Sequence, residues 1–200
     1  MDVSHYYGAS IKEIRDSLQR SEEKHAELSL KERHALALEL WDSGVHDARL
    51  LAIEIEHSRY ITKVQLDKWI KESDFFDLVD TIVRDLVSKT SYMPEKIEQW
   101  TASESPLIRR AGFMTLAELA KSKKKVDDEL LADALAVIGR HLAEEHDFVK
   151  EAMNYALISI GRRGKELQRM AQDVARMIGR IAISYGGEQK VAPDARAILA

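Results

Sequence analysis

Cysteine is absent from this chain of 200 residues, and proline is scarce, with three residues against nine glycines. Without thiols the chain can form no disulfide bond, and a cysteine nucleophile or thiolate metal ligand is excluded. This absence leaves the cellular compartment open, with a preference for the cytoplasm. The small number of helix-breaking residues indicates short connections, such as those that join one helix to the next.

Long hydrophobic runs are also missing. No apolar segment approaches the length of a membrane span, and the amino-terminal stretch MDVSHYYGASIKE lacks the basic start and apolar core of a signal peptide. Hydrophobic residues make up 45% of the chain and charged residues 32%, which is typical of a soluble globular protein. We therefore expect one soluble, cytoplasmic domain over residues 1–200, with no membrane partner.

A net positive charge is lacking as well, because the formal charge is −4. The charge is unevenly distributed: residues 1–105 carry 14 Lys and Arg against 21 Asp and Glu, whereas residues 106–200 carry 16 against 13. Residues 148–180 carry 7 basic and 3 acidic side chains. Phosphate binding needs only a local basic face, so DNA is not excluded. Asymmetry of this size is also common in helical proteins, and charge alone does not decide the partner.

Apolar residues recur at helical spacing along almost the whole chain, from residues 11–18 onwards, and no sustained alternation of period two is present. Asn-Gly and Asp-Gly hairpin signals are absent too. Three polar residues stand where an N-cap is required, before residues 30–41, 63–71 and 107–121: Ser29, Thr62 and Ser105, the last followed by a proline suited to the first helical position. We predict about ten helices and no sheet.

The helices repeat. A β-branched, a polar, a charged and an alanine residue follow one another at 45–48, 108–111 and 149–152, and Val79 falls between the first two. Successive anchor positions, 48, 79, 111 and 152, lie 31, 32 and 41 residues apart. That period is typical of paired-helix solenoids, in which a small residue lets the neighbouring helix approach. An irregular helical bundle is the alternative. In a solenoid the second helices line a concave face, which places Asp80, Arg110 and Tyr155 near one another.

Five segments, in order, resemble motifs of the DNA alkylation repair family, often called AlkD-like. The resemblance extends from about residue 7 to about residue 180. The family motifs are LW-x-SGIHEARLLA, D-S-W-D-L-x-D, VKRAGF, NFVKKAVNWAL and IGKR. The matching segments are Leu40–Ala52, Asp74–Asp80, Ile108–Phe113, Asp147–Leu157 and Ile160–Arg163.

The resemblance implies an all-α fold, a HEAT-like helical-repeat superhelix whose concave face cradles duplex DNA. It also implies removal of cationic N3- and N7-alkylated purines. Asp80 falls on the family's catalytic aspartate and Arg110 on its DNA-contacting arginine. Phe76 and Tyr155 stand where active members usually carry tryptophans. Further DNA contacts are expected from three basic residues of the stretch 148–180: Lys150, Arg162 and Arg163.

The chemistry implied by the resemblance needs one carboxylate. An alkylated purine is already cationic and leaves without a general acid, so the difficulty is the oxocarbenium-like sugar, which an ionised Asp80 can stabilise. The aromatic faces of Phe76 and Tyr155 would attract the cationic base. Arg110 would hold a flanking phosphate bidentately. We expect no cofactor, no metal, and a monomer bound to duplex DNA with alkylated or distorted bases, nucleoid-associated while bound.

Each of these residues also has a purely structural interpretation. Asp80 lies four positions before Arg84 and can form an exposed ion pair with it. Arg110 occupies a position where solenoids pair an arginine with an acid on the neighbouring repeat. Phe75 and Phe76 are adjacent, so at least one is expected in the core. Tyr155 can be a core residue with its hydroxyl at the rim.

Two features are interpreted as carrying no site. His141 and His146 are five residues apart, which does not place two zinc ligands on one helix face. The lysine-rich run 121–125 is expected to be a solvated turn between helices rather than a DNA contact. Two functional alternatives stay open beside excision: a non-catalytic paralogue that binds branched or damaged DNA, and a HEAT-type scaffold that binds a protein.

Overall fold

The computed structural model describes residues 29–124, 126–185 and 188–200, and the predicted helix at residues 11–18 lies outside them. The described ranges form ten α-helices, two short 3-10 helices and one two-stranded sheet, which confirms the all-α class. Four consecutive pairs of helices come first: α2 (Leu30–Asp42) with α3 (His46–Ile55), α4 (Lys63–Glu72) with α5 (Phe76–Asp85), α6 (Met93–Thr101) with α7 (Pro106–Lys121), and α8 (Asp128–His141) with α9 (Asp147–Gly161). The remaining elements are η1 (Val87–Lys89), η2 (Leu142–Glu144), α10 (Lys165–Ile178), β1 (Ala182–Tyr185), β2 (Glu188–Val191) and α11 (Ala195–Ile198).

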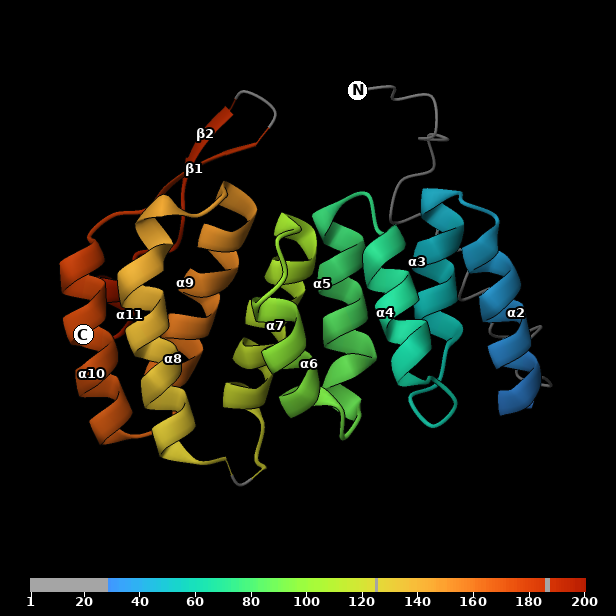
Figure 1. The fold of residues 1–200 in the computed structure, drawn as a ribbon, viewed down its shortest axis with the longest axis horizontal. Helices are drawn as coiled ribbons and strands as arrows, with labels where there is room; N and C mark the ends of the chain where they lie inside the picture. The colour runs from blue at the N-terminus through green and yellow to red at the C-terminus, as the bar shows by residue number, and fades with distance from the viewer. Residues whose placement is uncertain (1–28, 125, 186–187) are drawn as a thin grey trace.

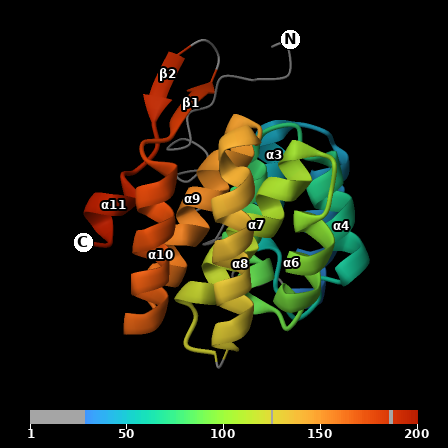
Figure 2. The same ribbon diagram turned by 60° about the vertical axis from the view of Figure 1, so that its left-hand side comes forward.

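The helix pairs stand side by side in a row, from α2 at one end to α10 at the other (Figure 1). The second helices α3, α5, α7 and α9 contact one another in chain order and form one layer. Each first helix packs on the second helix of its pair, and Figure 2 shows α6 and α8 in front of α7 and α9. Helix α10 packs against α8 and α9 and ends the row. This is the solenoid arrangement that the repeat predicted. No described helix is both long enough and apolar enough to cross a membrane.

The three predicted helix starts are confirmed. Ser29 caps α2 in a capping box with Glu32, and the Thr62 hydroxyl accepts a backbone N–H at the start of α4. Ser105 is the N-cap of α7 without a side-chain bond, and Pro106 occupies the first turn, where its missing N–H costs nothing. Local sequence signals therefore determine where these helices begin.

Small anchor residues let the helices pack closely. Three of the four predicted anchor residues, Val79, Ala111 and Ala152, are fully buried, whereas Ala48 is half-buried. Gly112, next to one anchor, lies against α6 so closely that a Cβ there would be 2.5 Å from the backbone nitrogen of Thr101. Two apolar clusters fill the interior, one in each half of the row, and partly buried side chains at their boundary pack against both: Ile97, Met114 and Val126.

The prediction of no sheet was wrong. β1 and β2 pair antiparallel, with Ala182 opposite Val191 and Tyr185 opposite Glu188, and the hairpin projects beyond the end of α9 (Figure 1). Strands of four residues are too short to show a period of two. The signal that was missed is the Gly-Gly dipeptide at 186–187 between two short runs. The hairpin is tied to α9, because the Ser184 N–H donates to the Asp147 carboxylate (2.8 Å).

Candidate nucleic-acid interface on the second helices

Arg110 joins three consecutive second helices. Its Nε and Nη2 donate to the two carboxylate oxygens of Asp80 on α5, at 2.7 and 2.6 Å. Its Nη1 donates to Glu151 Oε2 on α9 (2.9 Å) and to the carbonyl oxygen of Phe148 (2.8 Å). Arg110 itself is only 1% exposed. We call Asp80, Arg110 and Glu151 the Arg110 cluster.

The contacts of the cluster test the two ion pairs that the sequence suggested for Arg110 and Asp80. The pairing of Arg110 with acids on neighbouring repeats is confirmed. The pairing of Asp80 with Arg84 is wrong, because Arg84 forms its ion pair with Asp85 instead (2.7 Å). Helical spacing made a pair between Asp80 and Arg84 possible. The buried Arg110 guanidinium binds the Asp80 carboxylate more favourably, because it donates to both carboxylate oxygens.

Burial and mutual attraction set the charges of the cluster. Burial alone would lower the pKa of Arg110, but the carboxylates of Asp80 and Glu151 raise it above its ordinary value, so the guanidinium stays charged. Burial raises the pKa of Asp80, and the hydrogen bonds from Arg110 oppose that rise. Side-chain exposures of 24% for Asp80 and 16% for Glu151 leave both carboxylates an edge toward solvent. With all three groups ionised, the cluster carries a formal charge of −1.

A row of aromatic side chains lies over the cluster. The rings of Phe75 and Phe76 are 4.4 Å apart, Phe76 and Phe148 are 5.6 Å apart, and Phe148 and His146 are 4.9 Å apart. The Arg110 guanidinium lies 5.0 Å from the centre of the Phe76 ring, close enough for a cation–π contact. We call these four residues the aromatic row. None of them is buried.

The expectation that Phe75 or Phe76 lies in the core was wrong, since both are half-buried. The reason is that Phe75 lies outside the helix: it is the N-cap of α5 with an extended backbone (φ −142°, ψ 154°). Its ring can therefore lie beside that of Phe76. Sequence reasoning did not single out Phe148 or Glu151, although both belong to the family-like segment at 147–157. It considered His146 only as a zinc ligand and assigned it no site.

The other predicted contact residues lie along α9 or at its carboxyl end. Tyr155 is half-buried against the carboxyl-terminal core cluster, and burial together with the negative charge of Glu151 raises the pKa of its hydroxyl. Lys150 pairs with Asp147 one turn away (3.1 Å). Arg162 and Arg163 follow the last turn of α9, so the structure does not bring them to the Arg110 cluster.

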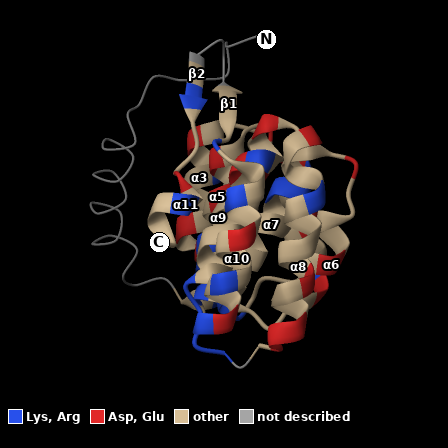
Figure 3. Ribbon diagram, turned by 90° about the vertical axis from the view of Figure 1, so that its left-hand side faces the viewer, with Lys and Arg blue, Asp and Glu red and all other residues tan. Residues whose placement is uncertain are grey.

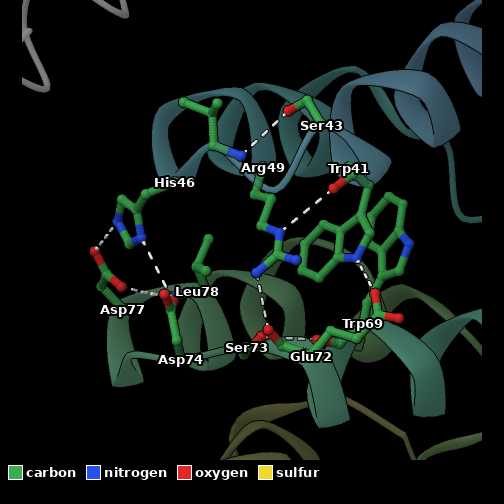
Figure 4. A network of polar contacts seen from close by, with 11 residues as sticks. Trp41, Ser43, His46, Arg49, Trp69, Glu72, Ser73, Asp74, Asp77 and Leu78 are labelled. Atoms are coloured by element: carbon green, nitrogen blue, oxygen red, sulfur yellow. Dashed lines mark hydrogen bonds and ion pairs between the residues drawn. The ribbon is translucent and has the colours of Figure 1, made fainter. Parts of the chain in front are cut away.

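The family-like segment 40–52 forms a structural joint between the first two helix pairs (Figure 4). The rings of Trp41 and Trp69 stack with centres 4.3 Å apart and planes at 7°, and the Trp41 indole N–H donates to Glu72 (2.7 Å). Arg49 adds two further contacts to this joint. Its guanidinium lies 4.9 Å from the Trp41 ring centre and donates to the Glu72 carbonyl (2.8 Å).

The same segment contains a tight turn and a buried histidine. Gly44 adopts φ +72° between α2 and α3, a conformation that side chains with a Cβ disfavour. His46 Nε2 lies 2.9 Å from Asp77 Oδ2 on α5, and this hydrogen bond raises the pKa of His46 against the opposing effect of burial. The polar contacts from α3 to α5, from α5 to α7 and from α7 to α9 therefore form one ladder along the second helices.

These features define the class. A row of paired helices, with second helices in one layer linked by a polar ladder, is a HEAT-like helical-repeat protein. The comparison with solved structures agrees: the chain superposes with a TM-score of 0.79, at 21% identity, over 92% of its length and 77% of the other chain. That structure is described as "A new family of proteins related to the HEAT-like repeat DNA glycosylases with affinity for branched DNA structures".

The chain belongs to the DNA alkylation repair enzyme family, whose model matches residues 2–187. Among curated proteins it is similar to the uncharacterized protein Lin0241 of Listeria innocua serovar 6a, at 23% identity over 94% of this chain and 80% of the relative. It is also similar to the uncharacterized protein Lmo0209 of Listeria monocytogenes serovar 1/2a, at 23% identity with the same coverage. The family resemblance seen in the sequence is thus confirmed.

Proposed function

We propose that this protein binds branched or distorted DNA on its second-helix face without excising a base. The observation that carries the proposal is the bidentate ion pair of the Arg110 cluster. Both oxygens of the Asp80 carboxylate accept hydrogen bonds from Arg110, and the Arg110 guanidinium donates to four protein oxygens. Excision would use a carboxylate that faces the sugar and an arginine that faces a phosphate, whereas these hydrogen bonds join the two groups to each other.

The two charges of the Asp80–Arg110 pair act in opposite directions on a cationic sugar. Two unit charges about 4 Å apart interact by about 4 kcal/mol at an effective dielectric constant of about 20. A cationic sugar beside Asp80 would gain about that much from the carboxylate. The guanidinium, hydrogen-bonded to the same carboxylate but farther from the sugar, repels the sugar and offsets part of that gain. Part of the stabilisation that excision needs is therefore lost.

The aromatic row supplies a surface that suits unstacked bases. Planar rings attract bases of any sequence, at about 1–3 kcal/mol per stacked base. Paired bases inside an intact duplex do not expose these faces, whereas bases at a junction or a distorted site do. The row consists of half-buried or exposed rings at the amino-terminal ends of α5 and α9, beside the Arg110 cluster. The solved relative described as having affinity for branched DNA supports the same choice of partner.

Excision of cationic alkylpurines is the second candidate, and one observation favours it. Glu151 binds the opposite side of the Arg110 guanidinium, so the cluster keeps a net negative charge while Asp80 retains an exposed edge. A residual field could still stabilise a cationic sugar. Under this candidate Asp80→Asn abolishes base release. Phe76→Trp together with Tyr155→Trp raises release through a cation–π gain of about 1 kcal/mol per contact.

The binding proposal predicts the effect of removing one ring of the aromatic row. Phe148→Leu keeps an apolar side chain and the backbone carbonyl that Arg110 contacts, but it removes the stacking face. We expect the affinity for a four-way DNA junction to fall by about 1–3 kcal/mol, or about fivefold to more than a hundredfold. Affinity for a linear duplex of equal length should change little. Fluorescence anisotropy with labelled DNA measures both.

Tyr60→Leu is the matched control, because Tyr60 is an exposed aromatic residue on the α3–α4 connection and stacks on His34 rather than on the aromatic row. Its junction affinity should equal that of the wild type. Equal losses in the two variants, or wild-type binding that does not prefer junctions, would contradict the proposal. Wild-type protein with no salt-dependent DNA affinity would favour a protein-binding scaffold.

A further inference from the structure

A basic pocket lies where α7 and α9 both end. Its volume is about 550 Å³, and the residues around it come from two stretches about 40 positions apart: Ala120, Lys121, Ser122, Lys123, Ser159, Arg162 and Arg163. Four of these side chains are cationic and none is acidic. Figure 3 shows the corresponding blue segments together at the end of the molecule where the connection from α7 to α8 meets the start of α10. We call this the α7–α9 pocket.

Arg163 builds the wall of the pocket. Its guanidinium donates to the carbonyl oxygens of Ala120 (2.9 Å), Ser122 (3.0 Å) and Lys124 (2.6 Å). These carbonyls belong to the last turn of α7 and the loop that follows, where a helix carries partial negative charge. Arg163 therefore fixes the loop and neutralises the helix end, which makes it a structural residue and leaves little of its charge for a ligand.

Arg162 and Lys123 are different. Both are exposed, and within the described ranges neither side chain forms a hydrogen bond or ion pair. Cations near a helix end can bind its last carbonyls, as Arg163 does, but these two do not. The Lys121 ammonium already forms an ion pair with Glu118 (2.8 Å). An unpaired guanidinium and an unpaired ammonium thus come from opposite walls of one pocket.

The chemistry of the lining selects an anion that only accepts hydrogen bonds. The hydroxyls of Ser122 and Ser159 already donate to carbonyls of their own helices, at 2.7 Å each. Because these hydroxyl protons are used, Arg162 and Lys123 remain as the donors to a ligand. A guanidinium binds a phosphate group bidentately, and an ammonium adds a compact charge.

The pocket lies on the same side of α9 as the Arg110 cluster. Glu151, Tyr155 and Arg162 follow one another at intervals of four and seven residues, which are one and two helical turns. Glu151 and Arg162 are eleven positions apart, which corresponds to about 16 Å along the helix axis at about 1.5 Å per residue. This distance corresponds to about five nucleotides at about 3.4 Å each along one strand.

We propose that the α7–α9 pocket binds one backbone phosphate of the DNA through Arg162 and Lys123, about five nucleotides from the site at the Arg110 cluster. The assignment rests on the proposed function, which it deepens: the pocket fixes the register of the strand, and the aromatic row holds the distorted part. Because phosphate contacts carry no base information, the pocket contributes affinity and position but no sequence preference.

Salt dependence tests the pocket. Junction affinity is measured at several salt concentrations for the wild type, for Lys123→Gln/Arg162→Gln, and for the control Arg169→Gln/Arg176→Gln. The control removes the same charge from α10, where both arginines pair with acids of their own helix. The slope of log affinity against log salt should become shallower by about 0.9, one phosphate contact, in the pocket variant only. If the wild type binds junctions and the two variants have equal slopes, the pocket assignment is overturned while the proposed function stands.

If the wild type binds no junction, the proposed function is refuted. A second measurement then tests the pocket by itself. Backbone amide resonances are followed in a titration with a four-nucleotide thymidine strand, and separately with inorganic phosphate. Shifts at residues 120–123 and 159–163 that the strand causes, and that Lys123→Gln/Arg162→Gln abolishes, support the pocket. The absence of such shifts overturns it. Equal shifts with inorganic phosphate would assign the pocket to a free anion and overturn the DNA assignment.

Discussion

Arg110→Ala is expected to lower the free energy of unfolding by about 3–5 kcal/mol, because it leaves two carboxylates partly buried without their partner. Arg110 is 1% exposed and bonds three consecutive second helices, so its loss removes contacts between repeats rather than within one. Urea unfolding followed by circular dichroism measures the change. Asp80→Ala should cost less, because Glu151 and the Phe148 carbonyl still bind the guanidinium.

Arg84→Ala is the control for this prediction. Arg84 is on α5 near Asp80, but its side chain is 62% exposed and its ion pair is with the adjacent Asp85. Exposed pairs contribute about 0–1 kcal/mol, so the free energy of unfolding should change by no more than that. If Arg110→Ala leaves stability within about 1 kcal/mol of the wild type while weakening DNA binding, Arg110 is a phosphate clamp and the structural assignment fails.

Trp41→Ala is expected to cost about 3–5 kcal/mol of unfolding free energy, the range for deleting a buried tryptophan. Trp41 is fully buried, stacks on Trp69 and donates to Glu72, so its removal opens the joint between the first two helix pairs. The cation–π contact with Arg49 is lost at the same time. Thermal and urea unfolding both report the change.

Trp41→Phe separates packing from hydrogen bonding. It keeps an aromatic face against Trp69 but loses the indole N–H, and Glu72 is exposed enough to be solvated. Its cost should be less than half that of Trp41→Ala. Equal costs would mean that the hydrogen bond to Glu72, and not the stack, holds the joint.

Much of the fold could be predicted because its signals are local. Polar caps at Ser29 and Thr62 and the proline at 106 fix helix starts through bonds within one turn. The spacing of the anchor residues predicted the paired-helix repeat. The hairpin was missed because its strands are too short for periodicity, and the core expectation for Phe75 failed because a cap residue was taken as helical.

The candidate site was predicted only in part. Family-like segments located Asp80, Arg110 and Phe76, and the repeat placed them on neighbouring helices. Spacing does not state whether Asp80 pairs with Arg84 on its own helix or with Arg110 on the next repeat. That choice depends on burial and on the bidentate fit of the guanidinium, which exist only after the repeats pack. The α7–α9 pocket was predicted only in part: Arg162 was expected to contact DNA, whereas the lysine-rich run at 121–125, which includes Lys123, was expected to be a solvated turn. The two walls are far apart in the chain and meet only after the repeats pack.

Release of 7-methylguanine and 3-methyladenine from methylated duplex DNA tests the central claim most directly. The assay uses enough wild-type protein to saturate the DNA, with Asp80→Asn in parallel and quantification of free bases. Because Arg110 binds both oxygens of the Asp80 carboxylate, we predict no release above the spontaneous rate for either protein, although both bind DNA. Release by the wild type that Asp80→Asn abolishes would contradict the account and establish excision.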